Sequence, residues 1–125
     1  PTRGIANHQV YQFKTAQRAA EEYEWRRKTQ LSESRNTGPW RTPGEVSYRS
    51  PIADQYTVAC GKSWGAHVCI MLAQYEEYYV LLTAHMSEES MTYAALEKVL
   101  RAIDERMSVC LDKPLPPTPT AGAAW

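Results

Sequence analysis

The stretch AHVCIMLAQYEEYYVLLTAH, residues 66–85, constrains the fold more than any other part of the chain. Two β-rich apolar runs flank a polar QYEE, and this pattern is typical of a β-hairpin. A helix is the alternative, because the turn has no Gly or Asn and because Ala, Leu and Met are well represented. We favour the hairpin as the centre of a small antiparallel sheet. Shorter strand candidates precede it at residues 45–49 and 55–60.

Two helices are expected to flank the sheet. Residues 7–31 contain no Gly or Pro and predict an N-terminal helix with a thin apolar stripe. Residues 87–111 predict an amphipathic helix, with Ser87 or Ser90 as its N-cap. Its apolar positions follow the i, i+3, i+4, i+7 pattern: Leu96, Val99, Leu100, Ile103 and Met107. This C-terminal helix is expected to pack on one face of the sheet.

The end of the chain differs in composition from the rest. Four prolines lie between Pro114 and Pro119, which favours an extended or polyproline II conformation. The sequence therefore predicts a single α+β domain over residues 1–112, followed by an extended Pro-rich tail over residues 113–125.

The position of the hairpin turn decides which residues share a face of the sheet. We expect the turn to centre on Glu76. One face is then wholly apolar and lies under the C-terminal helix: Val68, Ile70, Leu72, Val80, Leu82 and Ala84. The other face is half apolar: His67, Cys69, Met71, Ala73, Tyr79, Leu81, Thr83 and His85. Such a face is rarely left bare, so either the N-terminal helix or a second chain is expected to cover it.

The motif GKSWG, residues 61–65, fits the G-x-S-x-G pattern around the nucleophilic serine of many α/β-hydrolases. A small hydrolase using Ser63, with His67 and His85, is therefore one functional alternative. Two observations oppose it, because the residues after the motif favour a strand and 125 residues are few for a doubly wound sheet. A phosphate-binding P-loop would need Gly where Tyr56 stands. We expect a connection between strands, with Gly61 and Gly65 as turn residues.

A metal site is a further alternative. The expected register places His67 opposite His85, with Cys69 on the same face, and these residue types suit zinc. The His67 to Cys69 spacing is too tight in a strand for the common zinc patterns, so no metal and no cofactor are predicted. Three cysteines at irregular spacing argue against a disulfide framework and favour a reducing, cytoplasmic location.

Charge and hydropathy exclude two kinds of partner. Fourteen Lys and Arg balance fourteen Asp and Glu, so no overall field attracts the chain to nucleic acid. No apolar run approaches the roughly 18 residues of a membrane span, so no membrane partner is expected.

These observations favour a non-enzymatic protein-interaction module, such as a small subunit, adaptor or inhibitor. It is expected to act through the half-apolar sheet face and through its tails, with a protein partner or as a homo-oligomer. The predicted partner-binding residues are Met71, Tyr79, Leu81, Thr83, Trp40 and Trp125.

Overall fold

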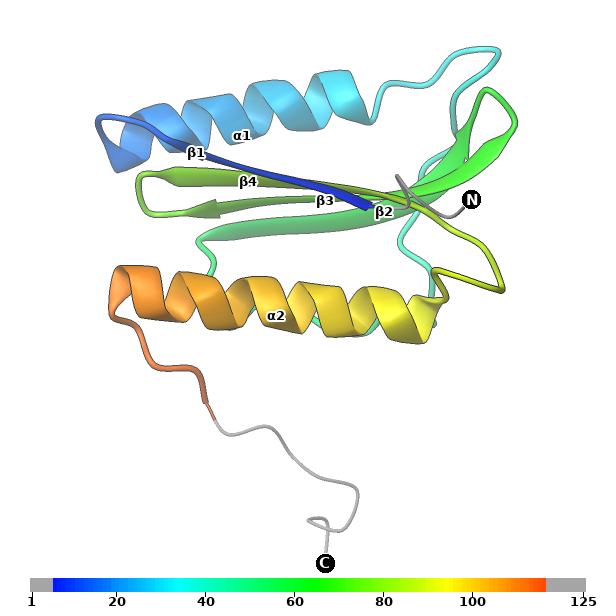
Figure 1. The fold of residues 1–125 in the computed structure, drawn as a ribbon. Coiled ribbons are helices and arrows are strands. Elements are labelled where there is room, and N and C mark those ends of the chain that lie inside the picture. Colours follow the sequence, from blue (N-terminus) through cyan, green and yellow to red (C-terminus); the bar gives the residue numbers. More distant parts are fainter. Residues whose placement is uncertain (1–5, 117–125) are drawn as a thin grey trace, which may run out of the picture.

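The structure is a computed structural model in which residues 6–116 are described. Four antiparallel strands form one sheet in the order β1-β4-β3-β2, with α1 on one face and α2 on the other (Figure 1). The elements, in chain order, are β1 (Ala6–Gln12), α1 (Ala16–Gln30), β2 (Gln55–Ser63), β3 (Ala66–Tyr75), β4 (Tyr78–His85) and α2 (Tyr93–Leu111). The α+β class, the hairpin and the two flanking helices are as predicted.

The first strand, β1, lies where the sequence predicts the start of the N-terminal helix, and that part of the prediction is wrong. Thr15 is the N-cap of α1, and its side chain accepts the N–H of Arg18 at 3.1 Å. The seven residues from Ala6 to Gln12 pair instead with β4. Helical spacing of a few apolar residues is only a weak indication of a helix, and pairing with a neighbouring strand outweighs it.

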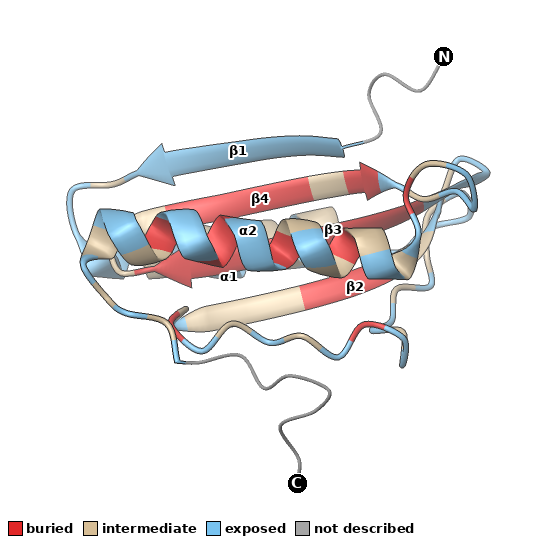
Figure 2. Cartoon of the chain, turned by 60° about the horizontal axis from the view of Figure 1, so that its bottom comes forward, coloured by how far each residue is buried: buried red, intermediate tan, exposed pale blue. Residues whose placement is uncertain are grey.

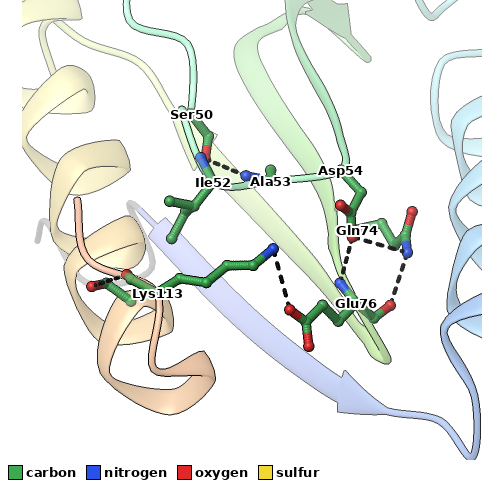
Figure 3. Close-up of polar contacts among 8 residues, drawn as sticks. Ser50, Ile52, Ala53, Asp54, Gln74, Glu76 and Lys113 are labelled. Atoms are coloured by element: carbon green, nitrogen blue, oxygen red, sulfur yellow. Dashed lines mark hydrogen bonds and ion pairs between the residues drawn. The ribbon is translucent and has the colours of Figure 1, made fainter. Parts of the chain in front are cut away.

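The turn between β3 and β4 shifts the register by one residue from the prediction. Tyr75 pairs with Tyr78, so Glu76 and Glu77 form a two-residue turn, and Glu76 has a positive φ of 53°. Three contacts support this turn without Gly or Asn (Figure 3). The Glu76 N–H donates to Asp54 Oδ2 at 2.7 Å, its carbonyl accepts Gln74 Nε2 at 2.8 Å, and its carboxylate pairs with Lys113 Nζ at 3.2 Å.

The shifted register exchanges the two faces of β3. Val68, Ile70 and Leu72 belong to the hydrophobic cluster under α1, and their predicted place beneath α2 is wrong. The α2 cluster instead takes the other alternate residues of β3 together with the predicted residues of β4: Cys69, Met71, Ala73, Tyr75, Val80, Leu82 and Ala84. The N-terminal helix thus covers the second face, which is one of the two coverings expected from the sequence.

The helix α2 begins at Tyr93 with Thr92 as its N-cap, so neither Ser87 nor Ser90 has that role. Its buried side chains turn toward the sheet as predicted: Leu96, Leu100, Ile103 and Met107. The predicted strand at residues 45–49 is wrong, because this segment is irregular. Glu97 on α2 accepts the N–H groups of Ser47 and Tyr48 at 2.7 and 3.1 Å, which satisfies backbone groups that a sheet would otherwise pair.

Two smaller observations complete the fold. Within residues 6–116, neither helix is long and apolar enough to cross a membrane. The predicted tail lies largely outside the described residues, although its first residue, Lys113, is bonded through its backbone to Ser108 at the end of α2.

Candidate interaction site

The two edges of the sheet differ sharply. The outer edge of β2 is covered by residues 37–42. Arg41 and Cys60 exchange two backbone hydrogen bonds at 3.0 and 2.7 Å, and Gly38 donates to the Lys62 carbonyl at 2.7 Å. The hydroxyl of Thr42 donates to the Val58 carbonyl at 2.6 Å. This edge therefore has few free backbone groups to offer.

The outer edge of β1 is open. All seven of its residues are exposed, and Figure 2 shows the strand in pale blue at the margin of the sheet, clear of α2. Among residues 6–116, no backbone group pairs with this outer edge. Phe13 donates its N–H to the Glu77 carbonyl, so its backbone groups point toward β4. Along a strand, successive residues direct their N–H and C=O groups to opposite sides. The outward-pointing N–H and C=O groups of β1 are therefore those of Ala6, His8, Val10 and Gln12.

The side chains of β1 leave this edge unprotected. The strand contains no Lys, Arg, Asp, Glu or Pro, which are the residues that commonly prevent pairing at an edge. Val10 is 46% exposed and Tyr11 39% exposed. Tyr11 stacks on Tyr79 with 6.1 Å between ring centroids, so one side of its ring is held by the fold. We call the outer edge of Ala6–Gln12, with these side chains, the open edge.

His8 does not add charge to the open edge at neutral pH. Its pKa is lowered from the ordinary value of 6.5, first by partial loss of solvation and second by the positive charge of Arg106 on α2. The imidazole is therefore neutral at pH 7, and the whole strand is uncharged.

The predicted partner-binding residues are not gathered on one surface. Met71 is 1% exposed under α2, whereas Tyr79 and Leu81 are 0% and 7% exposed in the cluster under α1. Thr83 is half-buried, and Trp40 is half-buried with its indole N–H donating to the Ser32 carbonyl at 3.1 Å. Trp125 lies outside the described residues. The half-apolar face is thus divided between the two cores.

The motif GKSWG forms the end of β2 and a turn into β3. Trp64 and Gly65 have positive φ values of 52° and 86°, and a strand follows rather than a helix. Gly61 is not a turn residue as predicted: it lies in β2, where an added Cβ would stand 2.6 Å from the Pro39 carbonyl oxygen. Ser63 and His85 line one hollow of about 330 Å³, but no hydrogen bond joins them among the residues described. The geometry of a nucleophile elbow is therefore not formed.

The cysteines also differ from the prediction. Cys60 and Cys69 lie opposite one another in β2 and β3 and form a disulfide, with Cys110 free and exposed. Irregular spacing in the sequence does not reveal two residues that a hairpin brings face to face. The reducing location that the sequence predicts from its cysteines loses that support.

The residues of the zinc alternative are dispersed. His67 pairs with Lys62 across β2 and β3, on the α2 side of the sheet, while His85 lies on the α1 side. Cys69 is in the disulfide. In the described part of the chain, no group of three or more His, Cys, Asp or Glu side chains could hold a metal ion.

A basic hollow lies at the end of the sheet near the start of α2. It has a volume of about 630 Å³, and Arg41, Lys62, His67 and Tyr93 are among its lining residues. The Tyr93 hydroxyl lies 3.4 Å from His67 Nε2. Arg41, Lys62 and His67 are exposed, so the hollow does not separate a ligand from water. The sequence gives no signal for it, because its residues come from three separate segments.

The structure also contains a buried carboxylate that is not predicted from the sequence. Asp104 on α2 is fully buried and accepts hydrogen bonds from the hydroxyls of Tyr48, Ser50 and Tyr75. Burial, followed by the hydrogen bond to Asp104, raises the pKa of Tyr48 and of Tyr75 well above the ordinary value. All these hydroxyls are therefore protonated donors at neutral pH. The cluster joins α2, β3 and the 48–50 segment, which is a structural role.

A comparison of the chain with protein-family models, curated proteins and solved structures finds no match.

Proposed function

We propose that this chain is a protein-interaction module that binds a partner by adding a strand to the open edge. The observation that carries the proposal is the contrast between the two sheet edges. The β2 edge is covered by residues 37–42, whereas β1 is uncharged, exposed along its whole length and unpaired on its outer side among the residues described.

Strand addition explains how such an edge could bind. Main-chain hydrogen bonds from an extended partner supply affinity, and side chains at alternate positions supply specificity. Val10 projects on the α2 side of the sheet and Tyr11 on the α1 side, since they pair with Val80 and Tyr79 respectively. A partner strand would therefore meet one apolar and one aromatic side chain. The roles of small subunit, adaptor and inhibitor are all compatible with this mode.

Proline at Val10 tests the proposal. The Val10 N–H points away from β4, so Val10→Pro removes no bond of the β1–β4 ladder but deletes a donor at the centre of the open edge. Val10→Thr is the matched control, because it keeps the donor and the β-branched shape. Trp25→Ala, on exposed α1, controls for loss of an exposed aromatic.

Capture of partners from native lysate, quantified by mass spectrometry, compares the four proteins. We expect at least one partner that binds wild type, Val10→Thr and Trp25→Ala but is lost from Val10→Pro. Circular dichroism and thermal unfolding check that Val10→Pro remains folded. Partners retained equally by folded Val10→Pro would refute strand addition at β1.

A further inference from the structure

We infer that the strand received by the open edge is β1 of a second copy of this chain, paired antiparallel across a two-fold axis at Gln9. The two sheets would then form one continuous sheet. This inference rests on the proposed function, since it names the partner of the same edge.

The outward-pointing backbone groups of β1 match those of a second, antiparallel copy of the strand. A two-fold axis at Gln9 places residue 8 opposite residue 10 of the copy, and residue 6 opposite residue 12. These are the four residues whose N–H and C=O groups point outward: Ala6, His8, Val10 and Gln12. Each outward residue therefore meets an outward residue, and such pairs exchange two hydrogen bonds. A shift of the copy by one residue would set outward groups against inward ones and lose this match.

The side chains also match across this axis. On the α2 side, the neutral imidazole of His8 lies opposite the isopropyl group of Val10 of the copy. On the α1 side, Gln9 meets its own copy, and an amide can both donate to and accept from an identical amide. Tyr11 lies opposite Asn7 there. Two copies of a strand with a net charge repel one another when they pair, whereas an uncharged strand has no such repulsion to overcome.

Access to the edge is not blocked by the helices. All seven residues of β1 are exposed, so neither α1 nor α2 covers the strand. Figure 2 shows β1 lying to one side of α2 at the sheet margin. A seven-residue strand pair is a small interface, which belongs to the class of weak, concentration-dependent contacts.

Site-specific disulfide trapping tests the register. In a Cys110→Ser background, Gln9→Cys places two thiols opposite each other at a non-hydrogen-bonded position, where Cα atoms lie about 4.5 Å apart. That separation permits a disulfide. Asn7→Cys is the matched control, because the two copies of residue 7 would be about 13 Å apart along the strand. We expect mild oxidation to give a covalent dimer with Gln9→Cys and not with Asn7→Cys.

Two further measurements separate this inference from the proposed function. Val10→Pro added to Gln9→Cys should abolish the cross-link, and light scattering of the wild type should show mass rising toward a dimer at protein concentrations up to about 1 mM. Equal cross-linking of both cysteine variants, or a monomer throughout, would overturn the second copy as partner. If the chain stays monomeric but a different protein is lost only from Val10→Pro, strand addition stands and its partner is not a second copy. If Val10→Pro reduces neither the cross-linking of Gln9→Cys nor the capture of any partner, both inferences fail.

Discussion

The hydrogen-bonded cluster around Asp104 gives a prediction whose size can be worked out from the structure. Tyr75 is fully buried, and its hydroxyl donates to Asp104 Oδ1 at 2.7 Å. Asp104 also accepts from Ser50 Oγ at 2.8 Å and from the Tyr48 hydroxyl. No ion pair to Asp104 is found within residues 6–116, so these hydroxyls supply its stabilisation. Hydrogen bonds to a charged group contribute about 1.5–3 kcal/mol each.

Tyr75→Phe deletes one of these bonds and leaves two, so we expect the free energy of unfolding to fall by about 2 kcal/mol. Asp104→Ala removes the acceptor of three bonds and leaves the buried Tyr75 hydroxyl without a partner. We expect it to lower the free energy of unfolding by about 3–5 kcal/mol. The double variant should cost about 2 kcal/mol less than the sum of the single variants, because both changes remove the same bond.

Tyr79→Phe is the matched control. Tyr79 is as fully buried as Tyr75, but its hydroxyl has no hydrogen-bond partner among residues 6–116. Its deletion removes an unsatisfied polar group, so we expect no loss of stability and a gain of up to about 1 kcal/mol.

Equilibrium unfolding in urea measures all four variants, and thermal unfolding should follow at about 4 °C per kcal/mol for a chain of this size. Equal losses for Tyr75→Phe and Tyr79→Phe would show that removal of ring hydroxyls, and not the Asp104 bond, sets the cost. Strict additivity of Tyr75→Phe and Asp104→Ala would refute the direct bond between them.

Two more predictions concern β2 and β1. Gly61→Ala should lower the free energy of unfolding by about 1–3 kcal/mol, because the added methyl group would displace Pro39 from the β2 edge. In the control variant Gly44→Ala the methyl group meets nothing within 4 Å, so the free energy of unfolding should hardly change. Equal effects of the two variants in urea unfolding would contradict the close approach of Pro39 to Gly61. Stability should also fall as pH drops below the ordinary His8 pKa of 6.5, since a lowered pKa in the fold means that the unfolded chain binds the proton more readily. Subtracting the pH profile of His8→Gln from that of the wild type isolates this loss, and identical profiles would exclude it.

The sequence was sufficient to predict elements that depend on local pattern. The stripe of α2 and the β-rich runs of the hairpin are both visible within a window of a few residues. The faces of β3 were not predictable, because Val68–Tyr75 is buried on both sides and shows no alternation of apolar and polar residues. The register then depended on the turn alone, and the groups that fix it, Asp54 and Lys113, lie far away in the sequence.

The open edge could not be predicted for a related reason. Whether a strand lies at an edge depends on the order of strands in the sheet, and β1 was itself read as helix because Val10 and Phe13 fit a helical spacing. Its lack of Lys, Pro and acidic residues is visible in the sequence. That signal acquires meaning only when β1 is known to be the outermost strand.

The position of β1 in the chain has a consequence for folding. The strands β2, β3 and β4 follow one another through short turns, whereas Ala6 must find Ala84, a separation of 84 − 6 = 78 residues. Loop-closure entropy therefore favours assembly of the three-stranded meander first and docking of β1 last. Because β1 covers the edge of β4, where Val80 and Leu82 are buried, partial unfolding that begins with β1 would expose the core. The strand that offers the binding edge is thus also the one that protects β4 from unintended pairing.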